Sequence, residues 1–217
     1  MIERDYIMRM IQQLASVLAK VLLHKEQGQI PEAFREIDEA SKGLIGMKWD
    51  FLRSFSAEQL SALLGAGDHP DKLLAASELL REGSVLLALE GKTEENVQQG
   101  MKAFSLFTEF LSRDRRDRKL LPVEKFAALL TELETQERTV EFEKKRFQFY
   151  ELAGELAKAK TVLEQVIALE PAFRREEHGF YRRLEKISDE DLQKGGLARE
   201  DVVRGLEASK APRRRSR

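Results

Sequence analysis

The stretch FEKKRFQFYELAGELAKAKTVLEQVIALEP, from Phe142 to Pro171, predicts two antiparallel helices joined by a tight turn. In its second half, apolar residues recur at three- and four-residue spacing, which places them on one side of a helix. These residues are Leu156, Ala159, Leu163, Val166 and Ile167. Gly154 suits the turn, and Pro171 ends the second helix because proline lacks the N–H that a helix interior needs.

The first helix of this pair carries two apolar stripes. One stripe contains Phe142, Phe149, Leu152 and Ala153, and the other contains Phe147 and Tyr150. A helix with two apolar stripes requires neighbours on two sides, as an inner helix of a stack has. We therefore expect the pair to lie inside a larger helical assembly.

The pair resembles the second half of a tetratricopeptide repeat, a helix–turn–helix unit of about 34 residues. The matching residues are Tyr150, Gly154, Ala159, Leu163 and Pro171. The first half of the motif is absent, because its glycine, leucine and tryptophan positions fall on Phe147, Arg146 and Glu143. An ordinary antiparallel helix pair is the alternative interpretation.

The segment GQIPEAFREIDEA, which begins at Gly28, repeats this pattern about 126 residues earlier. Its Gly28, Ala33, Ile37 and Ala40 have the spacing of Gly154, Ala159, Leu163 and Val166. The composition agrees with helices throughout, since 35% of the residues are charged, Pro and Gly are few, and strand-like alternation is absent. The sequence thus predicts an all-α, α-solenoid-like fold of stacked antiparallel helical hairpins that resemble tetratricopeptide repeats, with about 8–10 helices.

We expect a single helical-repeat domain over residues 1–209, followed by a disordered basic tail over residues 210–217. The charge run SRDRRDRK at 112–119 is the clearest linker, and a sub-division near 112–121 is compatible with it. Ser56, with Gln59 three residues later, predicts a capping box. Thr93 and Ser188 are further predicted helix caps.

Several chemistries lack the residues that they need. The chain has no cysteine, which excludes disulfides, thiolate nucleophiles and zinc–thiolate sites. None of the three histidines belongs to a Glu-x-x-His or His-Glu-x-x-His pattern, and neither a Gly-x-Ser-x-Gly elbow nor a phosphate-binding loop occurs. The sequence therefore predicts no catalytic residue, cofactor or metal, and a protein that is not an enzyme.

Charge and hydropathy bear on location and partners. The formal net charge of −1 creates no overall field that favours nucleic acid or an anionic membrane. The N-terminus does not read as a signal peptide, and no apolar run is long enough to span a bilayer. We expect a cytoplasmic protein without a membrane partner.

The opening MIERDYIMRMIQQLASVLAKVL, with EAFREIDEASKGLIGM and SAEQLSALL after it, resembles an uncharacterised family of all-helical bacterial proteins. Members of that family occur mostly in Gram-positive bacteria, and the resemblance covers roughly the first 110 residues. It implies an all-helical, tetratricopeptide-like fold and a cytoplasmic location. It implies no activity and no site residues.

The predicted function is that of a protein-interaction module or scaffold, whose helical hairpins bind a peptide or a partner helix. The partner's identity and the pathway are open, and a homodimer is compatible with the sequence. Candidate binding residues on the first helices of the pairs are Arg9, Gln13, Lys20, Lys145 and Gln148.

The alternative is a nucleic-acid-associated protein that uses three basic clusters to contact phosphates. The first cluster contains Arg113, Arg115, Arg116, Arg118 and Lys119. The second contains Arg174, Arg175, Arg182 and Arg183, with Phe180 and Tyr181 nearby. The third contains Arg213, Arg214, Arg215 and Arg217.

Overall fold

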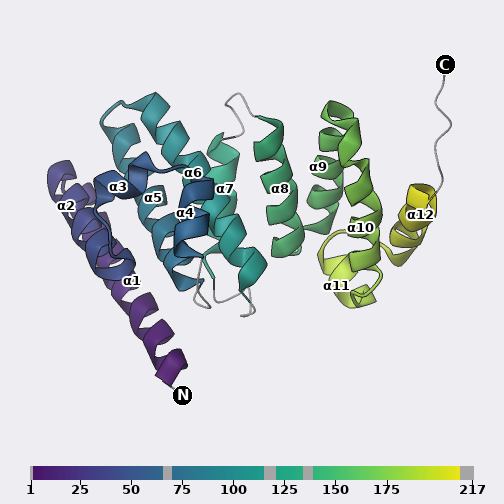
Figure 1. Cartoon of the computed structure of the whole chain (residues 1–217), viewed down its shortest axis with the longest axis horizontal. Coiled ribbons are helices and arrows are strands. Elements are labelled where there is room, and N and C mark those ends of the chain that lie inside the picture. Colours follow the sequence, from purple (N-terminus) through teal and green to yellow (C-terminus); the bar gives the residue numbers. More distant parts are fainter. Residues whose placement is uncertain (1, 66–69, 115–120, 134–138, 211–217) are drawn as a thin grey trace. The chain divides into compact units, whose positions relative to one another are not determined.

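The structure is a computed structural model, and it describes residues 2–65, 70–114, 121–133 and 139–210. Within these ranges every regular element is a helix, which confirms the predicted all-α class (Figure 1). The chain forms two compact units, Met1–Glu137 and Arg138–Arg217, so the division falls later than the segment 112–121. Residues 115–120 of the charge run and residues 211–217 of the predicted tail lie outside the described residues. Lys210, which was predicted to begin the tail, is the last residue of helix α12 (Arg199–Lys210).

The N-terminal unit contains eight described helical elements. They are α1 (Ile2–Glu26), α2 (Ile30–Ala40), the π-helix η1 (Ser41–Ile45), α3 (Trp49–Ser54), α4 (Ala57–Leu64), α5 (Asp71–Leu89), α6 (Thr93–Arg113) and α7 (Val123–Leu133). The C-terminal unit contains α8 (Val140–Ala153), α9 (Leu156–Leu169), the short 3-10 helix η3 (Pro171–Phe173), α10 (Arg174–Leu184), α11 (Asp189–Lys194) and α12 (Arg199–Lys210). The described ranges thus hold twelve α-helices instead of about 8–10, because short helices such as α3, α4 and α11 add to the long ones.

Three helical hairpins, α1–α2, α5–α6 and α8–α9, share one turn geometry (Figure 1). Gly28, Gly91 and Gly154 occupy the turns at equal intervals of 63 residues, with φ of 71°, 75° and 82°. In each turn the glycine N–H donates to the carbonyl three residues earlier, and the next N–H donates to the carbonyl five residues before it. Glycine adopts this left-handed conformation without the steric cost that a Cβ atom brings.

The residues that follow the middle turn depart from the pattern shared by the other two. In the α5–α6 hairpin, Asn96 and Gly100 stand where the other two copies have alanine and a large aliphatic residue. Gly100 has a packing reason, because a Cβ atom there would lie 3.3 Å from the side chains of Leu129 and Leu133 on α7. The close approach of α7 therefore accounts for the small residue at position 100.

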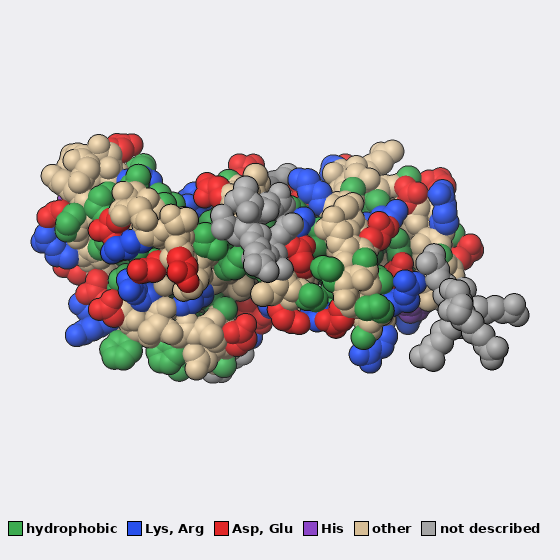
Figure 2. Space-filling view, turned by 90° about the horizontal axis from the view of Figure 1, so that it is seen from above, with side chains coloured by type: hydrophobic (Ala, Val, Ile, Leu, Met, Phe, Trp, Pro, Cys, Tyr) green, Lys and Arg blue, Asp and Glu red, His purple; other side chains and the backbone are tan. Residues whose placement is uncertain are grey.

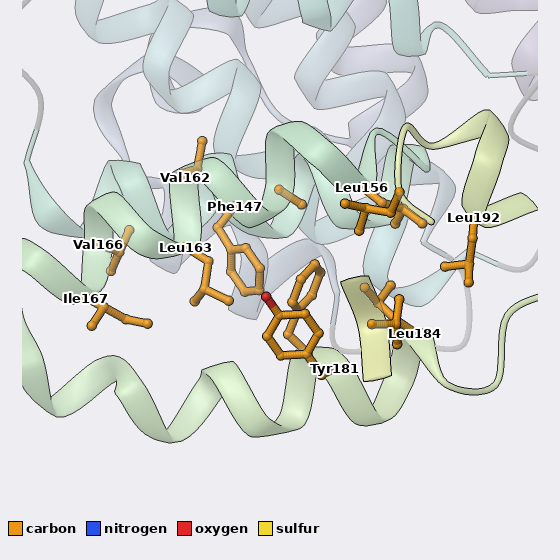
Figure 3. Packing of buried hydrophobic residues seen from close by; sticks show 13 residues of the cluster. Phe147, Leu156, Val162, Leu163, Val166, Ile167, Tyr181, Leu184 and Leu192 are labelled. Carbon is orange, nitrogen blue, oxygen red and sulfur yellow. The ribbon is translucent and has the colours of Figure 1, made fainter. Parts of the chain in front are cut away.

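The core of the C-terminal unit forms around α9, as predicted from its apolar stripe (Figure 3). All five predicted residues of that stripe are buried. Phe147 on α8 packs edge-on against Phe180 on α10, with ring centroids 5.6 Å apart. The helix ends two residues before Pro171, which begins η3 instead.

Two of the three predicted caps are confirmed. Ser56 and Gln59 form the reciprocal capping box of α4, with hydrogen bonds of 2.8 and 3.2 Å. The Ser188 hydroxyl accepts the backbone N–H of Asp191 at the start of α11. The prediction for Thr93 is wrong, because the left-handed turn at Gly91 places Lys92 at the cap position and makes Thr93 the first helical residue.

Candidate functional site

An open pocket of about 360 Å³ lies in the N-terminal unit, and we call it the aromatic pocket. Helix α2 contributes Pro31 and Phe34, α3 contributes Trp49, Asp50 and Arg53, and the end of α5 with its turn contributes Leu87, Glu90 and Lys92. Its volume falls within the range of about 300–1,000 Å³ that is typical of ligand sites. Its lining combines aromatic and aliphatic surface with charged groups.

The repeated hairpin turns bring these segments together. Pro31 and Phe34 follow the turn at Gly28, while Leu87, Glu90 and Lys92 flank the turn at Gly91. Both turns belong to the same unit, so two equivalent helix connections supply most of the lining. The pocket is therefore built from the ends of hairpins, where side chains reach solvent.

Helix α3 is held in place by Asp38 on α2. Its carboxylate accepts the backbone N–H of Trp49 at 2.9 Å, and it also accepts a hydrogen bond from the Lys42 ammonium. The bond from Lys42 and then the bond from Trp49 lower the pKa of Asp38 below its ordinary value of 3.8. Asp38 thus caps α3 from a neighbouring helix and fixes the position of the aromatic residue that follows.

Trp49 rests on α5 at a residue without a side chain. A Cβ atom at Gly83 would lie 2.3 Å from Cη2 of the indole, so only glycine permits this approach. Phe34 lies beside the indole, with ring centroids 6.4 Å apart and ring planes tilted by 40°. Trp49 is only 6% exposed.

The charges of the pocket are unequally matched. The Lys92 ammonium lies 2.9 Å from the Glu90 carboxylate, and Arg53 lies 3.5 Å from Glu95. Behind α3, the Lys102 ammonium donates to the Arg53 carbonyl, and burial together with the charge of Arg53 lowers the pKa of Lys102. Within the described ranges, the exposed carboxylate of Asp50 forms no ion pair. The pocket therefore presents one carboxylate that is available to a cation.

The predicted binding residues are divided between the two units. Arg9 and Gln13 line a smaller pocket of about 260 Å³ together with Met10 on α1 and residues of η1. Lys20 lies further along α1, where its ammonium is 3.3 Å from the Glu36 carboxylate. Lys145 and Gln148 lie on α8 in the C-terminal unit. Within the N-terminal unit, the structure thus brings Arg9 and Gln13 into one pocket and leaves Lys20 outside its lining.

Sequence reasoning missed the aromatic pocket because its residues come from three separated segments. The available signal was Trp49, the only tryptophan of the chain, in a short segment between two longer helices. Local patterns place a helix break at Gly91 but do not show that this turn lies beside Trp49.

The basic clusters of the alternative prediction are partly engaged within the protein. Phe180 and Tyr181 are buried in the core, so their rings are unavailable for stacking on bases. Arg183 donates to Glu151 and Glu176 at 2.6 Å, and these bonds, first that to Glu151, raise its pKa although burial opposes them. Arg113 bonds Glu109 and the carbonyl of Gly65. The remaining members of the first cluster and all of the third lie outside the described residues.

A partly buried ion cluster in the middle of α5 is the other concentration of charge. Arg81 donates to Glu78 at 2.9 Å and also bonds Glu82, and Lys25 and Lys125 each approach one of these carboxylates to 3.9 Å. Burial lowers the pKa of Arg81, but the two carboxylates outweigh it and raise the pKa overall. Each acid therefore has a cationic partner, which suits a structural link between α1, α5 and α7.

Neither a metal site nor a membrane-spanning helix occurs among the described residues. Within the described ranges, no group of three or more His, Cys, Asp or Glu side chains is placed to hold a metal ion. Among the same residues, no helix combines the length and the apolar character needed to cross a membrane.

Comparison with known proteins places the chain at the level of a family. No curated protein and no solved structure matches it. One family, described as a family of unknown function (DUF6483), matches residues 1–213, which is nearly the whole chain. The chain therefore belongs to this family of unknown function (DUF6483).

Proposed function

We propose that the protein is a non-enzymatic interaction module, in which tetratricopeptide-like helical hairpins present a surface that binds a segment of another protein. The aromatic pocket is the observation that carries this proposal. It combines an open volume with aromatic walls at the ends of two repeated hairpins. Hairpin repeats commonly bind extended or helical peptides on such surfaces.

The composition of the pocket favours a peptide over a small metabolite. Its apolar part, made by Phe34, Trp49 and Leu87, can receive one side chain of a partner, and tryptophan is enriched among residues that dominate binding energy. The charged part, at its rim, can orient the neighbouring residues of the same segment. A single well-desolvated anchor with a polar rim is the usual anatomy of a protein–protein contact.

Trp49 makes the proposal directly testable, because it is the only source of tryptophan emission in the chain. A library of displayed random peptides would be selected on the full-length protein and counter-selected on the Phe34→Ala variant. We expect selected peptides to change the Trp49 emission saturably, and to bind the Phe34→Ala variant at least tenfold more weakly, a loss of about 1.4 kcal/mol.

The matched control is Leu169→Ala, which removes an exposed apolar side chain from α9 in the other unit. This variant should bind the selected peptides as the unchanged protein does. If selection yields no peptide that distinguishes the full-length protein from Phe34→Ala, the aromatic pocket is not a peptide site and the proposal fails.

A further inference from the structure

The geometry points to a specific ligand for the aromatic pocket: an arginine side chain of a partner protein. This inference rests on the proposed function and names what the site recognises. It follows from two features of the pocket: its aromatic wall and its available carboxylate.

The aromatic walls suit a flat cation. Phe34 and Trp49 line the same pocket with their ring centroids 6.4 Å apart. A guanidinium group can stack on the half-buried ring of Phe34, against which the almost fully buried Trp49 packs. It is more weakly hydrated than an ammonium, so arginine loses less hydration than lysine on entering. The aliphatic part of an arginine side chain can also cover the apolar surface of Leu87 and Pro31 while its charge stays near the rim.

The charge balance favours a cation over an anion. The two basic residues of the lining already have carboxylate partners, Lys92 with Glu90 and Arg53 with Glu95. Asp50 has none among the described residues, and a carboxylate binds guanidinium through two parallel hydrogen bonds. Acidic residues also outnumber basic ones in the N-terminal unit as a whole. Figure 2 shows acidic and basic side chains interspersed on the face in view. An acidic ligand would be repelled by the Asp50 carboxylate, and the basic residues of the lining already have acidic partners.

The test uses two synthetic pentapeptides, acetyl-Gly-Ala-Arg-Ala-Gly-amide and the same peptide with citrulline. Citrulline keeps the shape of arginine and removes its charge. Titration of the full-length protein, followed by Trp49 emission, should show saturable binding of the arginine peptide and at least tenfold weaker binding of the citrulline peptide. Asp50→Asn should weaken binding of the arginine peptide by about the same factor, because it removes the ion pair.

Glu39→Gln is the matched control, because it removes one exposed carboxylate from α2 outside the pocket. It should leave both affinities unchanged, whereas a general charge effect would move them as Asp50→Asn does. Equal binding of the two pentapeptides, or no binding of either, overturns the arginine inference. If the peptides selected from the library bind at Phe34 but contain no arginine, the arginine inference is wrong and the proposed interaction module is still supported. If the library selection yields no peptide that binds at Phe34, both proposals are wrong.

Discussion

Trp49 owes its position to a glycine on the facing helix, and this contact predicts the effect of one substitution. Gly83→Ala places a methyl group where the indole now lies, since the built Cβ is 2.3 Å from Cη2. Overpacking of this kind typically costs about 1–3 kcal/mol. We expect urea denaturation to show a loss of that size in the free energy of unfolding, together with a change in Trp49 emission in the folded protein.

Gly43→Ala is the control for this prediction. Gly43 is also helical, but a Cβ atom there would have no other atom within 4 Å. Alanine should be tolerated at this position, because it lowers the entropy of the unfolded chain without a steric conflict. If Gly83→Ala and Gly43→Ala changed the free energy of unfolding equally, the added methyl group at Gly83 would cause no steric conflict. The prediction would then be wrong, because the indole would have moved aside without cost.

Asp38 predicts a dependence of stability on pH. Its folded pKa is lowered, first by Lys42 and then by the N–H of Trp49, so its stabilising contribution is fully present above its unfolded pKa of about 3.8. The contribution is lost as the pH falls through the lowered folded value. The difference in unfolding free energy between the unchanged protein and Asp38→Asn should therefore be constant near neutral pH and shrink in acid.

The partner variant Lys42→Gln separates this effect from general acid unfolding. Because Lys42 is the largest cause of the lowered pKa, Asp38→Asn should cost less stability in the Lys42→Gln background. If the effect of Asp38→Asn on the free energy of unfolding had the same pH dependence with lysine or glutamine at position 42, a group other than Lys42 would be responsible for the lowered pKa of Asp38.

The same turn geometry occurs in three helical hairpins, so the same substitution should lower the stability of the protein by a similar amount at each turn. Gly28, Gly91 and Gly154 share the same left-handed φ and the same hydrogen bonds. Replacement by alanine forces a Cβ atom into that conformation, at a cost of about 1–2 kcal/mol for each turn. Thermal unfolding of the three alanine variants should show losses in this range.

Asparagine is the matched substitution, because it tolerates the left-handed region better than alanine does. Each asparagine variant should be more stable than the alanine variant at the same turn. If alanine at Gly91 proved harmless while it destabilised the other two turns, the middle hairpin would not be equivalent to them.

The helices themselves were largely predictable, because their signals are local. The apolar stripe of α9 and the caps at Ser56 and Ser188 depend on residues a few positions apart. The aromatic pocket depends instead on contacts between segments distant in sequence, such as that of Trp49 with Gly83. A lone glycine inside a helix gives no local sign that an indole lies over it, so periodicity alone does not place the site.

On the scale of the whole molecule, the division into two units predicts where the chain can be cut. The core cluster of the C-terminal unit draws its members only from residues 147–202. Helix α7, in contrast, belongs to the N-terminal unit: Phe126 stacks on Phe107 of α6 with ring centroids 3.9 Å apart, and Leu129 and Leu133 face Gly100. A cut between Glu137 and Arg138 leaves these contacts intact, whereas a cut at the charge run removes α7 from its partner.

We therefore expect the fragments 1–137 and 138–217 each to show helical circular dichroism and a cooperative thermal transition. The fragment 1–121 should melt at a lower temperature than 1–137 or lack a transition, because it loses the burial of four apolar side chains, Phe126, Leu129, Leu130 and Leu133. Each fully buried side chain of this kind contributes about 1.5–3 kcal/mol, so their sum is comparable to the total stability of a typical domain. Equal melting of 1–121 and 1–137 would place the boundary at the charge run, where the sequence offers its clearest linker.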